Sequence, residues 1–282
     1  GSHGQTLAHN PNSAPAYSLQ IGNPNIIAER THTTTVADFR GRDIAAHGQG
    51  APLTPAFHQA FFHSPEENRM VLNIGGIANI TYLPANKKQK VIGFDTGPGN
   101  CLMDQWMQQH QQQPFDKDGT LAQQGNVNTQ LLDRLLDDPY FKQAHPKSTG
   151  TDYFSLAWLR NKLDDNPLPI ADVQATLVQL TSLSIKQSIS LLDTTIDRVL
   201  VCGGGCANPV LMKALQEALT CPVESTKAYG LDPDWVEAVA FAWLAKQTLL
   251  NQPGNLPSVT GATGNRILGG IYKVGMISSH TQ

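Results

Sequence analysis

A single acid stands where a buried strand is predicted to end. Residues 91–94 (VIGF) predict the end of that strand, Asp95 follows, and residues 96–100 (TGPGN) predict a turn into a helix. Open α/β sheets bind ligands beyond their strand ends, so the Asp95 carboxylate could accept a proton from a substrate or a water. The alternative is that Asp95 only forms an Asx turn within its own loop.

Two arginines and an acid follow an earlier predicted strand. Arg40, Arg42 and Asp43 come directly after residues 33–39 and precede the glycine-rich stretch 48–52 (GQGAP). Guanidinium groups bind carboxylates and phosphates bidentately, so this segment predicts a site for an anionic or polyhydroxylated ligand. A surface Arg–Asp pair of little energetic weight explains the pattern equally well.

Two glycine turns are suited to phosphate or nucleotide. Residues 73–76 (NIGG) form the turn of a predicted hairpin, where glycine lets backbone amides approach a ligand closely. Residues 203–205 (GGG) link a predicted strand to a helix with Asn208 as its cap and Pro209 in its first turn, which fits a nucleotide at a helix N-terminus. The Walker A lysine and the dinucleotide-binding spacing are both absent.

Three other features point less clearly to a ligand. Glu237 lies alone in an apolar helical stretch, an awkward place for an acid unless it is paired or faces a cleft. Lys147 lies in a polar loop, where we expect it to be solvated. Cys202 and Cys206 are separated by three glycines with no matching Cys or His pair nearby, so we expect no metal bound by protein side chains alone.

Composition limits the classes of protein. The 282 residues are 40% hydrophobic and 15% charged, which suits one packed core or two lobes that share a cleft, and residues 64–68 are the best boundary. A net charge of -3 gives no footprint for nucleic acid or an anionic membrane. No apolar run approaches the roughly 20 residues of a membrane span, and no leader is recognisable. Four cysteines are too few for a disulfide scaffold, which favours the cytoplasm.

The elements that must position these residues follow from periodicity and capping. Residues 102, 103, 106 and 107 recur at helical spacing and are expected in the core. We expect strands over 17–21, 33–39, 70–74, 77–83, 91–94 and 198–202. Helices are expected from Asn23 and Pro24 onward and over 55–62, 100–111, 130–136, 170–192, 210–219 and 232–249.

Seven motifs together resemble the anhydro-N-acetylmuramic acid kinase family, in the right order and over nearly the whole chain. They are residues 1–6 (GSHGQT), 20–24 (QIGNP), 37–43 (ADFRGRD), 48–53 (GQGAPL), 72–76 (LNIGG), 93–100 (GFDTGPGN) and 201–205 (VCGGG). The resemblance implies a two-lobed α/β fold of the actin-like ATPase (ribonuclease H-like) superfamily, with mixed sheets flanked by helices and an interlobe cleft. We expect residues 1–66 and about 235–282 in the N-terminal lobe, and 67–234 in the C-terminal lobe.

The same resemblance implies the chemistry. ATP, with Mg²⁺, would phosphorylate O6 of 1,6-anhydro-N-acetylmuramic acid while water opens the anhydro bridge at C1, giving N-acetylmuramic acid 6-phosphate in cell-wall sugar recycling. Asp95 matches the general base for that water, and Arg42, Glu237, His3 and Gln49 are assigned to the sugar. Phosphate and nucleotide binding is assigned to Asn73, Gly75, Gly76, Gly97, Gly99, Gly203, Gly204 and Gly205. No metal ligand is assigned, and the family suggests a homodimer.

Two departures from the family pattern qualify this reading. His47 stands where the family usually has a glycine, which would crowd or polarise the sugar loop. Family members begin upstream with a strand and a phosphate loop rich in Gly, Ser, Thr and Asp, which this sequence lacks. We therefore expect an N-terminally truncated member. The alternatives are a catalytically impaired, sugar-binding fragment and a different sugar kinase of the same superfamily.

Overall fold

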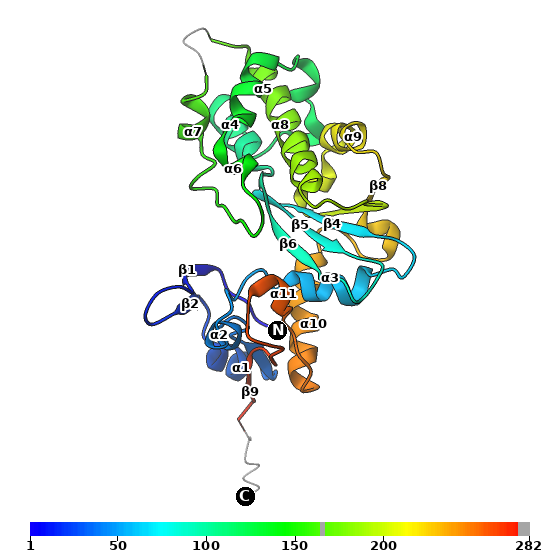
Figure 1. The fold of residues 1–282 in the computed structure, drawn as a ribbon. Helices are drawn as coiled ribbons and strands as arrows, with labels where there is room; N and C mark the ends of the chain where they lie inside the picture. The colour runs from blue at the N-terminus through cyan, green and yellow to red at the C-terminus, as the bar shows by residue number, and fades with distance from the viewer. Residues whose placement is uncertain (164–166, 276–282) are drawn as a thin grey trace, which may run out of the picture. The chain divides into compact units, whose positions relative to one another are not determined.

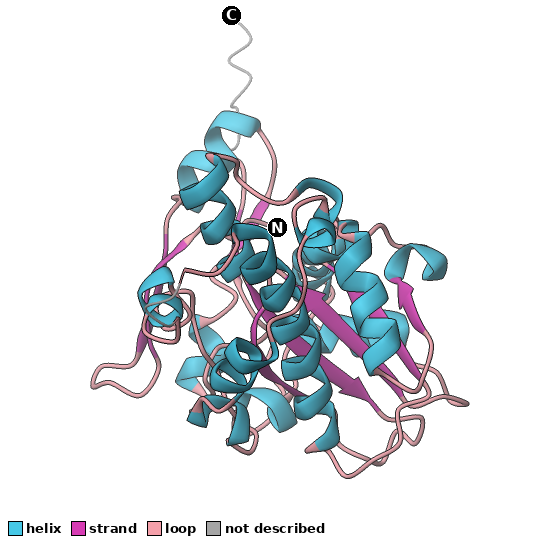
Figure 2. Cartoon of the chain, turned by 90° about the horizontal axis from the view of Figure 1, so that it is seen from above, coloured by secondary structure: helices cyan, strands magenta, loops and turns pink. Residues whose placement is uncertain are grey.

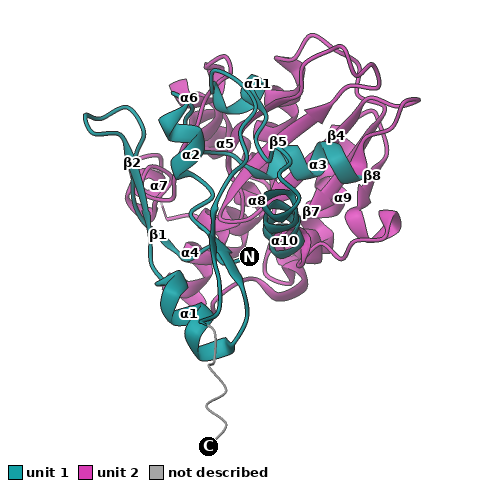
Figure 3. Ribbon diagram, turned by 90° about the horizontal axis from the view of Figure 1, so that it is seen from below, with its two compact units in different colours: residues 1–61, 237–282 teal, residues 62–236 magenta. Residues whose placement is uncertain are grey.

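The chain forms two compact units. The structure, a computed structural model, describes residues 1–163 and 167–275 (Figure 1). Unit 1 combines Gly1–Phe61 with Glu237–Gln282, and unit 2 is the continuous stretch Phe62–Val236 (Figure 3). Residues 276–282 of the predicted N-terminal lobe lie outside the described residues.

Unit 2 is built on a five-stranded mixed sheet in the order β6-β5-β4-β7-β8. Its strands are among those drawn in magenta in Figure 2. The hairpin of β4 (Arg69–Ile74) and β5 (Ile77–Leu83) continues antiparallel into β6 (Ile92–Pro98). On the other side of β4, β7 (Arg198–Cys202) and β8 (Val223–Ser225) run parallel to it. A hairpin joined to parallel strands through β4 is the ribonuclease H-like arrangement that the resemblance implies, and the α/β class is confirmed.

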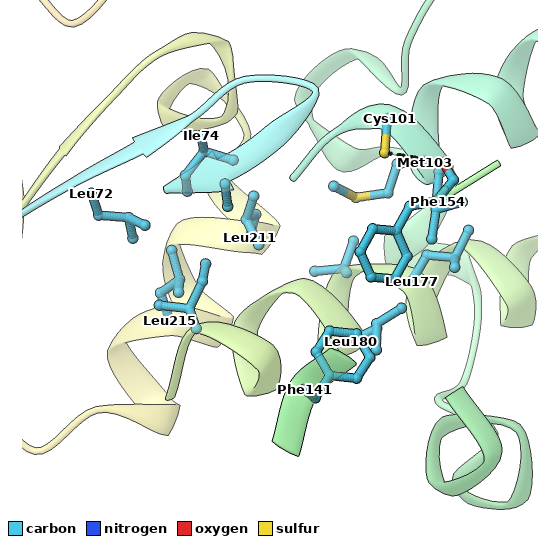
Figure 4. Close-up of a cluster of buried hydrophobic side chains, with 14 of the residues drawn as sticks. Leu72, Ile74, Cys101, Met103, Phe141, Phe154, Leu177, Leu180, Leu211 and Leu215 are labelled. Carbon is cyan, nitrogen blue, oxygen red and sulfur yellow. Dashed lines mark hydrogen bonds between the residues drawn. The ribbon is translucent and has the colours of Figure 1, made fainter. Parts of the chain in front are cut away.

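Helices cover one face of this sheet and bury one core. The main ones are α4 (Cys101–Gln111), α5 (Thr129–Leu136), α6 (Pro139–Lys142), α7 (Leu156–Arg160), α8 (Ile170–Ser190) and α9 (Pro209–Ala218). Leu72 and Ile74 of β4 share a core with Leu177 and Leu180 of α8 and with Leu211 of α9 (Figure 4). Because strand residues alternate between faces, every second residue of β4 enters this core.

Unit 1 contains two small antiparallel sheets of two strands each and five helices among the described residues. β1 (Thr6–Asn10) pairs with β2 (Tyr17–Gln20), and β3 (Thr35–Ala37) pairs with β9 (Gly270–Tyr272). The helices are α1 (Pro24–Thr31), α2 (Gly41–Ala45), α3 (Thr54–Phe62, which ends at the unit boundary), α10 (Val236–Leu249, from the same boundary) and α11 (Pro257–Thr260). Val36, Phe39 and Leu53 pack with Phe241 and Leu268 in its core, which joins the two ends of the chain.

Most predicted elements are present, and three details are corrected. Asp95 lies within β6, which continues to Pro98 because residues 92–98 keep pairing with β5. Arg42 and Asp43 are in the short helix α2, not in a loop. The strand predicted over 33–39 is only Thr35–Ala37. The short strands β1, β8 and β9 were not predicted, since three to five residues carry too little periodicity.

Candidate active site

Asp95 lies on β6 beside an irregularity in the pairing of β5 and β6. Asn79 pairs with Asp95 and Ala78 pairs with Gly97, so Thr96 is an extra residue between the two pairs. The Thr96 hydroxyl donates to the carbonyl of Ala78 at 3.1 Å and fills the irregularity. Such bulges re-aim side chains at sheet edges and functional sites.

The Asp95 carboxylate is half-buried, and one of its two oxygens accepts a backbone hydrogen bond. The backbone N–H of Thr149 donates to Asp95 Oδ2 at 3.0 Å. Burial raises the pKa of Asp95 above the ordinary aspartate value, and the Thr149 hydrogen bond opposes the rise. A carboxylate with a raised pKa is a stronger base than an exposed one, which suits proton abstraction.

The predicted glycine segments of unit 2 lie together. The backbone N–H of Asn100 donates to Gly75 O at 2.8 Å, and that of Gly99 donates to Gly76 O at 2.9 Å. A Cβ at Gly99 would lie 2.3 Å from Gly75 O, so only glycine allows this approach. The turn after β4 and the turn after β6 therefore form one surface.

The triple-glycine turn adjoins the same surface from β7. Asn73 of β4 and Cys202 of β7 are register partners, so the chain leaves both strands at one edge of the sheet. Gly203 has a φ of +80°, and a Cβ there would lie 2.4 Å from Asn73 Oδ1. Gly204 is exposed, whereas Gly205 is buried against Ile74.

A cavity of about 430 Å³ opens beside the triple-glycine turn. Its lining includes Asn100, Asp104, Phe115, Gly204 and Asn208. Asn208 caps α9 by accepting from the amides of residues 210 and 211, as predicted. Burial raises the pKa of Asp104 to about 6. The volume lies in the range of small-molecule pockets, and the wall offers an aromatic ring, amides and a carboxylate.

In unit 1, a half-buried guanidinium contacts His3, one of the predicted sugar residues. Arg40 Nε donates to His3 Nε2 at 3.1 Å, and Arg40 Nη1 donates to Gly50 O at 2.7 Å. Burial lowers the pKa of Arg40, and the charge of nearby Glu237 opposes this. Burial and Arg40 lower the pKa of His3 to about 4, so the ring is neutral near pH 7 and accepts through Nε2.

Asp43 holds the loop that carries Gln49. The Asp43 side chain is fully buried, and its carboxylate accepts from Gly50 N at 2.8 Å, Asn255 Nδ2 at 2.7 Å and Thr260 Oγ1 at 2.9 Å. The amide of Gln49 donates to Thr260 O at 2.7 Å. A buried carboxylate with three donors fixes the backbone around it, so the Gln49 loop is built rigidly.

Other predicted residues have different surroundings. Arg42 is exposed on α2, and Glu237 is exposed in the first turn of α10. His47 is exposed with a φ of +65°, a conformation that favours glycine. The prediction that Lys147 is solvated is wrong, because only 8% of it is exposed. Among residues 1–163 and 167–275, His, Cys, Asp and Glu form no group of three or more that could hold a metal ion.

Sequence reasoning missed Asp104 and Thr149 as site residues, and from the arginine pair it assigned only Arg42 to the sugar. Arg40 was available from the motif that contains Arg42, and only the fold distinguishes the half-buried arginine from the exposed one. Asp104 lies one turn into a helix predicted as core. Thr149 acts through its backbone N–H, which any residue except proline would supply, so its side chain gave no signal.

The ribonuclease H-like sheet has glycine turns and a ligand-sized cavity at its strand ends. These features place the protein among the α/β proteins that bind a ligand beyond the ends of their strands. The chain belongs to the anhydro-N-acetylmuramic acid kinase family, whose model matches residues 1–274. The curated anhydro-N-acetylmuramic acid kinase of Xanthomonas axonopodis pv. citri is 53% identical over 273 residues, covering 96% of this chain and 72% of that protein. That of Pasteurella multocida is also 53% identical, over 275 residues, with the same coverage.

A third relative has a similar identity to this chain, and one solved structure has a much lower identity. The anhydro-N-acetylmuramic acid kinase of Pseudomonas syringae pv. tomato is 52% identical over 274 residues, covering 96% of this chain and 74% of that protein. Xylulose kinase from Rhodospirillum rubrum aligns with a TM-score of 0.45 and 16% identity, over 71% of this chain and 44% of that one. Within the described part of the chain, no helix is long and apolar enough to cross a membrane.

Proposed function

We propose that this protein is an ATP-dependent kinase that acts on 1,6-anhydro-N-acetylmuramic acid. The oxygen of water bonds to C1, the bond between C1 and O6 breaks, and O6 takes the γ-phosphoryl group of ATP. The products are N-acetylmuramic acid 6-phosphate and ADP. The observation that carries the proposal is identity of 51–53% to proteins of this name over 96% of the chain.

Asp95 is the proposed general base. With Oδ2 accepting from the Thr149 amide, a proton from the attacking water would go to Oδ1. The raised pKa of Asp95 strengthens it as a base. Phosphoryl transfer itself needs mainly positioning and charge neutralisation.

The proposed nucleotide site is the glycine surface of unit 2. At the turn after β4, Gly76 is exposed and Gly75 is half-buried, and backbone amides at such a glycine turn suit phosphate oxygens. The cavity beside Gly204 suits adenosine. Asn73, Gly99, Gly203 and Gly205 would shape this surface through the close approaches described above. Gly97 would do so through its backbone, since its φ is +145° and a Cβ there would lie 2.7 Å from the Phe141 ring. Mg²⁺ would be bound through the phosphates, since it uses few protein ligands beside substrate oxygens.

The proposed sugar residues belong to unit 1. Gln49 lies on the loop that Asp43 holds, and His3 and Glu237 lie near Arg40. We add Arg40 to Arg42 as a candidate for the lactyl carboxylate of the sugar, because a guanidinium binds carboxylates bidentately. The neutral His3 ring would form a hydrogen bond with a hydroxyl group of the sugar.

We also propose the biological setting. The protein would act as a homodimer in the cytoplasm, in recycling of cell-wall sugars, with neither nucleic acid nor a membrane as its partner. Four cysteines present as thiols support the cytoplasm, and a net charge of -3 supports the absence of nucleic acid and membrane partners. The homodimer rests on the family resemblance alone.

Product analysis tests the reaction. The protein is incubated with ATP, Mg²⁺ and the anhydro sugar in H₂¹⁸O, and ADP release is measured beside the mass of the sugar product. The proposal requires one ¹⁸O at C1 and one phosphoryl group per ADP. A phosphorylated sugar without ¹⁸O would indicate a different sugar kinase, and sugar binding without ADP release would indicate a binding protein.

A further inference from the structure

One segment of unit 2 holds Asp95 at three of its groups. The N–H of Asp95 donates to Lys147 O at 3.2 Å, and the Tyr140 hydroxyl donates to Asp95 O at 2.8 Å. The amide of Thr149 donates to the carboxylate. Residues 140–149 therefore fix the backbone of Asp95 and the direction of its side chain together.

The Lys147 side chain turns back into this same segment. Its Nζ donates to Tyr140 O at 3.3 Å and lies 4.7 Å from the centre of the Tyr140 ring. The Phe94 ring, one residue before Asp95, lies 5.9 Å from the same Nζ. Only 8% of Lys147 is exposed, so the ammonium is poorly hydrated, and this burial lowers the pKa of Lys147. A poorly hydrated cation depends on such carbonyl and aromatic partners, so it restrains them strongly.

Tyr140 transmits this restraint to Asp95. Its carbonyl and ring contact the ammonium of Lys147, and its hydroxyl bonds to the carbonyl of Asp95. Its own N–H donates to Asp138 Oδ1 at 3.0 Å, and Asp138 also accepts from Trp158 Nε1 at 2.9 Å. Tyr140 is thus fixed at both ends, and a change at Lys147 has a direct route to Asp95.

We propose that Lys147 is a positioning residue for Asp95, holding Tyr140 and the Thr149 amide so that Oδ2 is occupied and Oδ1 is presented to the attacking water. The inference rests on the proposed function for the role of that water. The positioning of the carboxylate itself does not depend on it.

The charged and titratable groups around Asp95 are few. The segment 140–149 contributes Tyr140, Lys147 and His145, whose ring stacks on Phe94 at a centroid distance of 5.3 Å. Its other charged residue, Lys142, is exposed and paired with Asp137. Burial, with the charge of Asp95 as a second cause, raises the pKa of Tyr140, so its hydroxyl stays protonated and donates across the working pH range. From β5, the register partner of Asp95 is the uncharged Asn79.

The matched pair Lys147→Met and Lys142→Met tests the proposal by kinetics. Lys142 is an exposed lysine of α6 paired with Asp137, so its replacement controls for losing a charge. We expect Lys147→Met to lower kcat by about 10- to 100-fold, the cost of a misplaced catalytic group, with little change in the KM for sugar. The acidic limb of the pH profile should move to higher pH, since the Thr149 bond no longer favours the charged carboxylate. Equal kcat and equal pH profiles for the two variants would overturn the proposal.

An equilibrium measurement separates this inference from the proposed function. The free energy of unfolding is measured against pH for the protein and for Asp95→Asn, each with and without the Lys147→Met substitution. Because the folded pKa of Asp95 is raised, its contribution to stability is present in acid and is lost as pH rises through that pKa. We expect this loss to extend to higher pH in the Lys147→Met background. It can be measured even if the sugar is not turned over.

A milder variant covers the case in which Lys147→Met does not fold. Tyr140→Phe removes only the hydroxyl that donates to Asp95 O and leaves the ring under the ammonium. We expect the same upward movement of the pH profile with a smaller fall in kcat. An unchanged profile in a folded Tyr140→Phe protein would count against transmission through Tyr140 and overturn the proposal.

Discussion

A Cβ placed on Gly48 would lie 2.1 Å from Oδ2 of Asp43, so the Gln49 loop closes directly onto the buried carboxylate. Gly48→Ala forces either the loop or the carboxylate to move. We expect it to lower the free energy of unfolding by about 1–3 kcal/mol, the usual cost of overpacking, and to raise the KM for sugar. Gly264→Ala is the control, since its Cβ would meet first the flexible end of Arg266 at 3.2 Å. Equal stability of the two variants in urea would contradict the expectation.

Asp43→Asn tests whether the buried carboxylate is needed for its charge. Three donors converge on it, and an asparagine would turn an NH₂ group toward at least one of them. We expect a loss of about 2–4 kcal/mol in urea unfolding. Asp38→Asn makes the same change at an exposed residue that accepts from Gly41 N, which asparagine can also do. That control should stay within about 0.5 kcal/mol.

Asp95→Asn should separate catalysis from binding. Removing the general base is expected to lower kcat by about 10²- to 10⁴-fold, with sugar affinity by calorimetry retained. In the unaltered protein, kcat/KM should fall as pH drops through the pKa of Asp95, because the base must be ionised. Burial raises that pKa, so the fall should begin above the ordinary aspartate value of about 4. A profile flat down to that pH would argue against Asp95 as the base.

Gly203 and Gly230 both have a positive φ but differ in crowding and in ψ, which is 172° at Gly203 and 10° at Gly230. Their φ values are +80° and +84°, but a Cβ at Gly203 would lie 2.4 Å from Asn73 Oδ1, whereas nothing lies within 4 Å at Gly230. Alanine costs about 1–2 kcal/mol of backbone strain at the left-handed Gly230, and more at Gly203, whose φ and ψ lie in a region that is essentially restricted to glycine. We expect Gly203→Ala to lose a further 1–3 kcal/mol, roughly, and to raise the KM for ATP. Similar losses in thermal and urea unfolding would contradict this.

Asp104 should give the cavity of unit 2 a pH-dependent stability. Its folded pKa is about 6, above the unfolded value of about 4. Its contribution is therefore fully present in acid and is lost as pH rises from about 4 through about 6. We expect Asp104→Asn to remove this part of the pH dependence in urea titrations. An unchanged slope between those pH values would show that the carboxyl is not shielded from water in solution.

The strands and helices of unit 2 could largely be predicted, because their signals are local. The Asn208–Pro209 start of α9 and the apolar runs of β4 and β7 need no distant partner to be recognised. The family resemblance was confirmed for the same reason, since short contiguous motifs carried it. The end of β6 was misplaced because pairing with β5, which periodicity does not report, extends it past Asp95.

The candidate site was harder to predict where burial decides the chemistry. Lys147 lies in a sequence of polar residues, and only the packing of Tyr140 and Phe94 around it withdraws it from water. Arg40 and Arg42 have the same chemistry in sequence, and the turn of α2 exposes one while the other contacts His3. The hydrogen bond from the backbone N–H of Thr149 to Asp95 joins residues 54 positions apart, so no side-chain pattern in the sequence could predict it.

The pairing of Asp43 with Asn255 joins residues 212 positions apart and has a consequence for biosynthesis. Unit 2 is one uninterrupted stretch and can fold as soon as it leaves the ribosome. The first 61 residues can complete unit 1 only after the C-terminal part of the chain, from Glu237 onward, has been synthesised. Until Asn255 and Thr260 emerge, the Asp43 carboxylate lacks two of its three donors. Chaperones and proteases therefore have most access to the chain while unit 1 is incomplete, before its C-terminal part has been synthesised.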